Sequence, residues 1–295
     1  MATANGRIVP DKYPYSLSVQ WEAPWRTDRI YRVLESGKKF SAEDMLQLQN
    51  DIYSEFDLFF AERAEQAVDH AAHPSTRVRQ AADLLRNWDG RMSADSAAPT
   101  VARRAREKFA ALLLHAKLKP AGVGAEEYHW GMATVWLENV IRQQPSRWLP
   151  AGYASFDDVV VESMRQAVNE KGAPKNLESW RWGESNRIDI AHPIFARVPL
   201  LNHLSGPGAE EQSGSEYSVK AVTRHHGPSE RMTVDLADLD HSTLNLVTGQ
   251  SGNLLSPYHD DHWKAWYEGF TFALPFSEKA VNGAQAHRLV LTPGF

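Results

Sequence analysis

One cluster in the sequence carries side chains of the kind that metal ions bind. Residues 258–263 read Tyr-His-Asp-Asp-His-Trp, so two imidazoles and two carboxylates stand at four consecutive positions. These are donor types that zinc and manganese accept. Adjacent residues on a helix or strand point in divergent directions, however, and neither a His-x-x-x-His pair nor a distant third ligand is evident. We therefore expect no metal site here, but the polar start of a helix with Asp260 or Asp261 as its N-cap.

The sequence lacks the motifs of several other common catalytic and binding sites. Residues 249–252, Gly-Gln-Ser-Gly, place the second glycine one position too early for a Gly-x-Ser-x-Gly nucleophile turn. The glycine pairs at 122–124 and 206–208 do not continue into a phosphate-binding loop. The sequence has no cysteine, which excludes disulfides, thiolate metal sites and a cysteine nucleophile. The tryptophan segments 88–90 and 180–183 are more typical of packed indoles near helix ends than of a site.

The composition narrows the class of protein further. The chain has 295 residues, 42% apolar and 23% charged, which is ordinary for a folded globular protein. Its net charge of −5 argues against a nucleic-acid protein, because phosphate binding needs a basic surface. No apolar run approaches the roughly 18 residues of a membrane span, so we expect no membrane partner. Ten tryptophans and nine tyrosines suit a protein that handles an apolar group.

The elements that must position any site fall into two blocks. Apolar spacing and caps predict helices first and strands later, which favours an α+β fold over alternating α/β. A capping box at Ser41 and apolar positions from Met45 to Phe59 predict one long helix. The other predicted helices cover 26–34, 75–86, 98–116, 126–142 and 156–169, and the predicted strands cover 13–19, 217–223, 232–236, 244–247, 273–274 and 287–291.

Nine short motifs, read in order, resemble a known family. They are Thr-Ala-Asn-Gly-Arg at 3–7, Tyr-Pro-Tyr at 13–15, Arg-Thr-Asp-Arg-Ile at 26–30, Trp-Asp-Gly at 88–90, Trp-Arg-Trp-Gly at 180–183, His-Pro at 192–193, Gly-Pro-Ser-Glu-Arg at 227–231, Gly-Gln-Ser-Gly at 249–252 and Ser-Pro-Tyr-His-Asp-Asp at 256–261. Each motif is weak alone, but their order and spacing are specific. From Ala4 to about Phe276 the sequence resembles the later part of the β chain of penicillin acylases, which are N-terminal-nucleophile hydrolases.

The resemblance implies an enzyme that cleaves a linear amide bond. In this family a serine at the start of the β chain attacks the carbonyl, and its own α-amino group is the base. The family's oxyanion-hole asparagine matches Asn5, and the arginine that helps to order the site matches Arg29. The implied fold is the C-terminal part of an αββα sandwich with a large helical block. Its expected divisions are 1–40 with the core strand and first helix, 41–175 as the helical block, and 176–295 as the β-rich return to the core.

Departures from the family pattern shape the remaining expectations. No nucleophile is expected in this chain, since Met1 is not a serine and the family's serine lies well upstream of the asparagine strand. We therefore expect a C-terminal fragment that is inactive alone, whose partners are an α chain, the N-terminal part of the β chain and a small N-acyl substrate. No cofactor or metal is expected in the chain itself, because the family's calcium ligands also lie upstream. The parent protein is expected to be periplasmic or secreted.

Two functional alternatives stay open at this point. The chain is either part of such an acylase or a catalytically inert binding or structural remnant. Within the first alternative, the substrate is a β-lactam amide, an acyl-homoserine lactone or another N-acyl amine. An in-frame serine and an α-chain coding region upstream would decide between enzyme and remnant.

Overall fold

The chain forms two compact units, in a computed structural model that describes residues 2–19, 21–122, 133–192, 194, 195, 198 and 206–294. Unit 1 contains Met1–Ser36, Asp51–Ile188 and Ala209–His226. Unit 2 contains Gly37–Asn50, Asp189–Gly208 and Gly227–Phe295. The division into 1–40, 41–175 and 176–295 was expected from the family resemblance and describes parts of the family's fold, not compact units. It stays a prediction.

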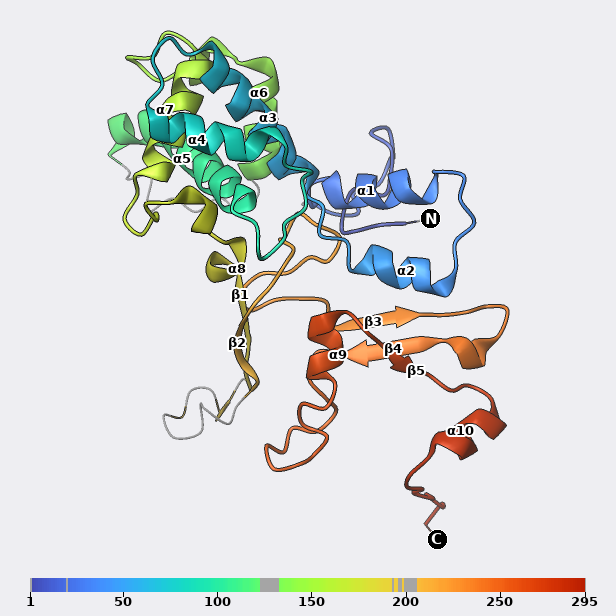
Figure 1. Cartoon of the computed structure of the whole chain (residues 1–295). Helices are drawn as coiled ribbons and strands as arrows, with labels where there is room; N and C mark the ends of the chain where they lie inside the picture. The colour runs from blue at the N-terminus through green and yellow to red at the C-terminus, as the bar shows by residue number, and fades with distance from the viewer. Residues whose placement is uncertain are drawn as a thin grey trace. The chain divides into compact units, whose positions relative to one another are not determined.

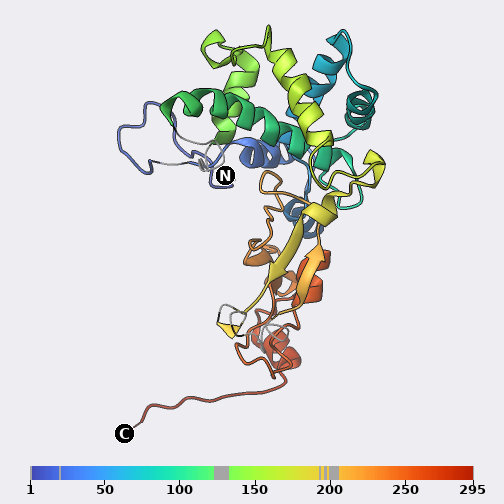
Figure 2. The ribbon, with the colours of Figure 1, turned by 90° about the vertical axis from the view of Figure 1, so that its left-hand side faces the viewer.

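Unit 1 is a helical block. Its helices are α1 (Trp25–Leu34), α3 (Glu55–His70), α4 (Thr76–Arg86), α5 (Ala98–Leu118), α6 (Ala133–Gln143), α7 (Phe156–Val168) and α8 (Trp182–Ser185), with short 3₁₀ turns η1 (Lys119–Ala121), η3 (Ser146–Trp148) and η4 (Leu177–Ser179). Figure 2 shows the long helix α5 beside α7, and α5 also packs against α3 and α4.

Local sequence signals account for these helices. Ser54, Ser75 and Ser155 each accept a hydrogen bond from a backbone N–H of the first turn of α3, α4 and α7. Such a cap satisfies one of the four N–H groups that a helix start leaves unpaired. The apolar faces meet in a core that includes Phe60 and Phe109, both almost completely buried. The helices predicted at 26–34, 75–86, 98–116 and 156–169 are confirmed.

The single long helix predicted from Ser41 to Phe59 is wrong. The capping box at Ser41 starts α2 (Ala42–Gln49), but this helix ends before α3 begins. Between them, the Asp51 carboxylate accepts a hydrogen bond from the Tyr53 N–H at 2.9 Å. Backbone hydrogen bonds also join Ile52 and Ser54 to residues 90–92. A short Asx-type turn and this long-range pairing outweigh the helical spacing of the apolar residues.

Unit 2 is built on a small antiparallel sheet. Strand β4 (Thr243–Leu246) lies between β3 (Glu230–Thr233) and β5 (Phe272–Ala273), with Arg231 opposite Asn245 and Leu244 opposite Phe272. Helix α2 packs on β3 and α9 (Trp263–Glu268) on β4, as Figure 1 shows, while η7 (Leu239–His241) and α10 (Glu278–Ala284) complete the unit. A separate two-stranded sheet joins β1 (Arg187–Ile190) to β2 (Gly208–Glu211), where the chain leaves unit 1 and returns to it.

Several strand predictions fail. Strands are found close to 232–236, 244–247 and 273–274, but residues 13–19, 217–223 and 287–291 form none. Within the described ranges no strand therefore joins the N-terminal segment to a shared sheet. The stretch 217–223 cannot stay extended because Ala221 has a φ of 48°, in the left-handed region. Residues 126–132 of the predicted helix 126–142 lie outside the described residues, and α6 covers the rest.

The described parts of the chain offer no candidate for a membrane-crossing helix. Each of their helices is too short or too polar to pass through a bilayer.

Candidate functional site

The backbone at Asn5 is held in an unusual conformation by a segment about 20 residues further on. Asn5 has a φ of 64°, and its carbonyl accepts a hydrogen bond from the Glu22 N–H at 3.0 Å. On one side of it, the Ala4 N–H donates to Oγ1 of Thr27 at 3.1 Å. On the other side, a Cβ added to Gly6 would lie 2.7 Å from the same Oγ1, so a larger residue would have to displace this hydroxyl. The contacts place Asn5 against the start of α1.

The side chain of Asn5 is oriented by one arginine. Nη2 of Arg26, on the first turn of α1, donates to Oδ1 of Asn5 at 3.0 Å. Because a guanidinium can donate but not accept, the amide oxygen of Asn5 must face it. The amide nitrogen Nδ2 then faces away and has no hydrogen-bond partner among the described residues, while the side chain stays exposed. Asn5 therefore presents an oriented and available N–H donor.

Arg26 is itself in a partly desolvated position. Burial lowers the pKa of Arg26, and the nearby Glu22 carboxylate opposes this shift. A guanidinium remains charged after such a shift, because its ordinary pKa lies so far above neutrality. The bond that it donates to Asn5 is therefore a charge-assisted one, which is stronger than a bond between neutral groups.

Asn5 opens onto a cavity that lies wholly within unit 1. The cavity has a volume of about 570 Å³. Among the described residues, non-glycine positive φ values are found at Asn5, Gln144 and Ala221, and two of these three line this cavity. Strained backbone of this kind concentrates at functional sites. The lining residues are Asn5, Glu22, Arg26, Glu216, Ala221, Thr223 and His226.

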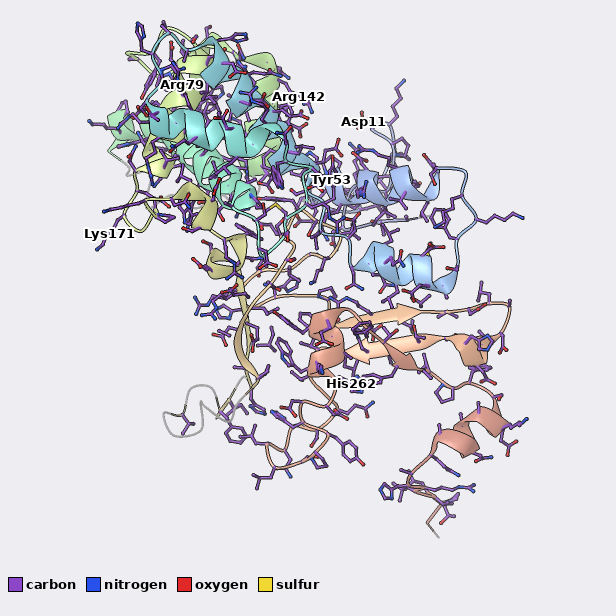
Figure 3. The ribbon with its side chains drawn as sticks, viewed as in Figure 1. Asp11, Tyr53, Arg79, Arg142, Lys171 and His262 are labelled. Carbon is purple, nitrogen blue, oxygen red and sulfur yellow. The ribbon has the colours of Figure 1, made fainter. Side chains whose placement is uncertain are left out.

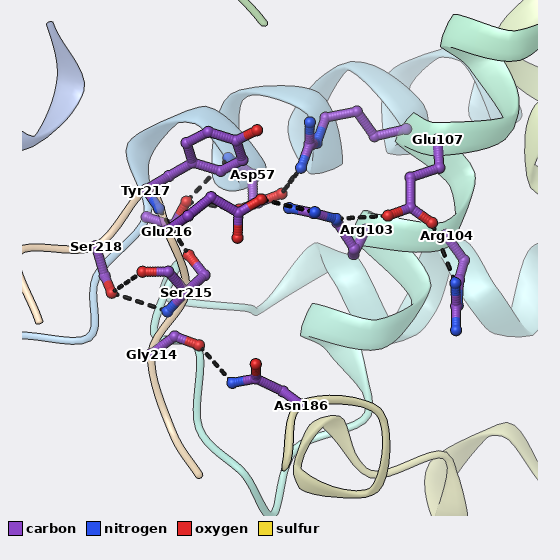
Figure 4. Close-up of polar contacts among 12 residues, drawn as sticks. Asp57, Arg103, Arg104, Glu107, Asn186, Gly214, Ser215, Glu216, Tyr217 and Ser218 are labelled. Atoms are coloured by element: carbon purple, nitrogen blue, oxygen red, sulfur yellow. Dashed lines mark hydrogen bonds and ion pairs between the residues drawn. The ribbon is translucent and has the colours of Figure 1, made fainter. Parts of the chain in front are cut away.

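The far wall of the cavity is a turn that α5 holds in place. Figure 4 shows the ion pair between Arg103 of α5 and Glu216, at 2.7 Å. Burial on its own raises the pKa of Glu216, but the charge and hydrogen bond of Arg103 outweigh it and the pKa lies below its usual value. Just before and after Glu216, the Ser215 N–H donates to Oγ of Ser218 at 2.9 Å, and the Ser218 hydroxyl donates back to the Ser215 carbonyl. Glu216 thus presents a fixed carboxylate to the cavity.

A buried ionic and aromatic cluster stands behind this wall. Asp57 of α3 is completely buried and pairs with Arg106 of α5 at 3.0 Å. The guanidinium of Arg106 lies 4.4 Å from the ring centre of Phe56 and 5.1 Å from that of Tyr217. Burial raises the pKa of Tyr217 to about 12, so its hydroxyl stays protonated. The cluster links the cavity wall to the core of the helical block.

Arg29 does not line the Asn5 cavity but contacts Asp51 and Tyr53. Its Nε donates to the Asp51 carboxylate at 2.7 Å, and its guanidinium lies 4.6 Å from the ring centre of Tyr53, which Figure 3 labels. The structure shows no contact between Arg29 and Asn5, and Arg29 does not line the cavity. The Asp51 carbonyl, however, accepts a hydrogen bond from the Lys220 N–H at 3.0 Å. Arg29 is therefore connected through Asp51 to Lys220, the neighbour in sequence of the cavity-lining Ala221.

The histidine cluster at 258–263 makes only structural contacts. Nδ1 of His262, labelled in Figure 3, accepts a hydrogen bond from the Leu246 N–H at 3.1 Å, and Nδ1 of His259 lies 3.0 Å from the Ser251 carbonyl. Within the described residues, no group of three or more histidine, aspartate or glutamate side chains could hold a metal ion. The predicted cap is wrong, because the N-cap residue of α9 is His262 and no side chain caps the helix.

The tryptophan segments are structural, as predicted. Nε1 of Trp88 donates to the Arg91 carbonyl and Nε1 of Trp182 donates to the Gly214 carbonyl, both at 3.0 Å. The second bond fixes the start of the turn that carries Glu216. Arg181 pairs with the carboxylates of Asp95 and Glu211.

Sequence reasoning missed most of the residues around Asn5. Arg26 was assigned no role, although it is in the same Arg-x-x-Arg motif as Arg29 and one turn earlier on α1. Its spacing to Arg29 was the one available signal, because it puts both arginines near one helix face. Glu22 and Glu216 carry no local signature, since a loop and a distant turn bring them together.

The comparison with protein families identifies the chain. The model of the penicillin amidase family matches residues 1–283, so the chain belongs to this family. The structure is also similar to that of a thermostable penicillin G acylase from Alcaligenes faecalis, with a TM-score of 0.66 and 16% identity, over 99% of this chain and 57% of that one. This likeness confirms the predicted α+β fold class of the N-terminal-nucleophile hydrolases.

Two curated relatives have informative names. The chain is 25% identical to penicillin acylase 2 proenzyme of Pseudomonas sp. (strain SE83), over 90% of this chain and 35% of that protein. It is 26% identical to the acyl-homoserine lactone acylase QuiP of Pseudomonas syringae pv. tomato, over 100% of this chain and 39% of that protein. The chain therefore spans well under half of the length of these relatives.

Proposed function

We propose that this chain supplies the oxyanion-donor side of a hydrolase that cleaves linear N-acyl amide bonds. The observation that carries the proposal is the oriented side chain of Asn5. Arg26 occupies its oxygen, its nitrogen is available, and it lines a cavity of about 570 Å³. Membership of the penicillin amidase family and the names of both relatives, which are acylases, support the same reaction.

The roles of the residues follow from the chemistry of acyl transfer. Attack on an amide carbonyl puts negative charge on its oxygen, and a preorganised N–H donor stabilises that charge without having to reorient. Nδ2 of Asn5 is the donor, while Arg26 holds the amide and Arg29 orders the cavity wall through Asp51. A serine outside this sequence is the nucleophile, with its α-amino group as base. This chemistry needs no cofactor held by the chain, and the family's calcium belongs to segments outside it.

The proposal extends to partners and compartment. An α chain and the N-terminal part of a β chain complete the site, and the complete acylase is periplasmic or secreted. β-Lactam amides and acyl-homoserine lactones are the two substrate classes that the names of the relatives favour. By itself, the chain 1–295 hydrolyses neither.

The test is the Asn5→Ala variant of the complete acylase, assayed with chromogenic acyl anilides. Loss of one oxyanion donor lowers kcat about 10²–10³-fold, and KM changes less because the donor acts mainly on the transition state. Asn282→Ala, an exposed asparagine of α10, is the matched control and should leave both constants unchanged. An unchanged kcat in Asn5→Ala would remove Asn5 from the reaction, and a large fall in the control would show that the loss is unspecific.

A further inference from the structure

The walls that this chain gives to the Asn5 cavity are polar. Ala221 is the only purely aliphatic side chain among the described residues that line it. The others are polar or charged: Asn5, Glu22, Arg26, Glu216, Thr223 and His226. An aliphatic or aromatic acyl group gains free energy mainly by leaving water for an apolar surface. Pockets for such groups are lined predominantly by hydrophobic and aromatic side chains. This cavity therefore does not suit the acyl half of an amide substrate.

The carboxylates of the cavity are more accessible to a ligand than the cations that pair with them. Among the described lining residues Arg26 is the permanent cation, and it already donates to Asn5 and lies near Glu22, while His226 adds an imidazole. Glu216 is held by Arg103, which lies behind the wall on α5 and does not line the cavity. A ligand inside therefore meets the carboxylate of Glu216 before it meets the cation that pairs with it. An amine or ammonium group complements such a surface, and an anionic group is repelled.

We propose that this cavity receives the amine half of the substrate, as an amine that carries no carboxylate. The acyl half lies outside the walls that this chain provides. The inference rests on the proposed function, because Asn5 places the scissile carbonyl at the mouth of the cavity. It favours lactone or other uncharged amine components over amines that bear a carboxylate.

Binding to the chain 1–295 tests the inference without any need for turnover. The probes are benzylamine and 4-(aminomethyl)benzoate, which differ by one carboxylate, and uncharged phenylacetamide as an acyl-half probe. NMR titration at low ionic strength should show benzylamine binding about five- to tenfold more tightly than the benzoate, with shifts at Asn5 and Thr223. The advantage is moderate because Arg26 and Arg103 offset part of the repulsion.

Variants show whether the preference for benzylamine comes from the carboxylates of the cavity or from the net charge of the protein. Glu216→Gln and Glu22→Gln should each reduce the advantage of benzylamine to about threefold or less. Glu62→Gln, an exposed position on α3 outside the cavity lining, is the matched control and should preserve it. Since Glu22 has no part in the buried cluster behind the wall, its variant gives an answer even if Glu216→Gln fails to fold. Equal binding of the two amines, or tighter binding of phenylacetamide at the same residues, would overturn the inference.

A kinetic arm distinguishes this inference from the proposed function. The complete acylase is assayed with a phenylacetyl 4-nitroanilide and with its analogue that carries a carboxylate on the anilide ring. If Asn5→Ala lowers kcat while the two anilides react equally well, the function stands and the inference fails. If the amines bind as expected but Asn5→Ala keeps full activity, the amine site stands and the proposed function fails.

Discussion

The orientation of the Asn5 amide can be reversed by design. Arg26 can only donate a hydrogen bond, so it selects the amide orientation in which Oδ1 faces it and Nδ2 is available. A charge-assisted hydrogen bond is worth about 1.5–3 kcal/mol, which biases the two orientations by roughly 10- to 150-fold. Replacing Arg26 with an acceptor should bind Nδ2 instead and turn Oδ1 toward the developing oxyanion.

Three variants of Arg26 in the complete acylase therefore form a graded series. Arg26→Lys remains a donor only, so kcat should stay within about threefold of the parent value. Arg26→Met removes the bias, which leaves the donor orientation about half populated and lowers kcat by about 2- to 10-fold. Arg26→Glu is an acceptor only, and its kcat should fall by about 10²–10³-fold, as far as that of Asn5→Ala.

The assay is initial-rate hydrolysis of a neutral acyl anilide, with thermal unfolding as a check that each variant folds. In an Asn5→Ala background the effect of Arg26→Glu should shrink to about threefold or less, because residues that act through one group are not additive. The reasoning is refuted if the lysine and glutamate variants are equally impaired. It is also refuted if Arg26→Glu costs as much without Asn5 as with it, since Arg26 would then act on something else.

Three further predictions concern stability. Arg106→Met leaves the fully buried Asp57 carboxylate without its partner and should lower the free energy of unfolding, measured by urea denaturation, by about 3–5 kcal/mol. Adding Asp57→Leu to the same chain should restore part of that loss. The pKa of Glu216 is lowered in the folded state, so its contribution to the free energy of unfolding is present above about pH 4.5 and is lost as the pH falls below that value. Glu216→Gln should therefore weaken the dependence of the unfolding free energy on acid pH, and an unchanged dependence would contradict this prediction. Gly249→Ala makes the added Cβ clash with the Tyr258 carbonyl oxygen and should lower the free energy of unfolding by about 1–3 kcal/mol, measured by thermal unfolding. Gly252→Ala, which has open space around it, is the control.

Features that depend on a few neighbouring residues could be predicted from the sequence. The capping box at Ser41 and the helices predicted at 75–86 and 156–169 are confirmed, because a cap and an apolar face are local signals. The break between α2 and α3 was missed, since it depends on hydrogen bonds from residues 52–54 to residues 90–92. The strand predicted at 217–223 failed for a related reason, because the turn there is held by distant partners.

The candidate site was less accessible to prediction than the fold. Asn5 and Arg29 have no local signature, and only the family resemblance pointed to them; their assigned roles stay predictions. The structure adds Arg26 and Glu216, whose places depend on how residues 22–27 and the turn near residue 216 meet around Asn5. No spacing rule connects positions so far apart in the sequence.

The contacts around Asn5 also make the loop that follows it an independent unit for engineering. Ala4 and Asn5 form hydrogen bonds with residues of the segment 22–27, so the chain between them starts and ends at a fixed place. Within it, residues such as Tyr15 and Val19 are largely exposed. The entropic cost of closing a loop rises only slowly with its length. Insertions, deletions or grafted peptides between residues 8 and 19 should therefore be tolerated without moving the amide of Asn5. This loop could be randomised in a library while the orientation of that amide stays constant.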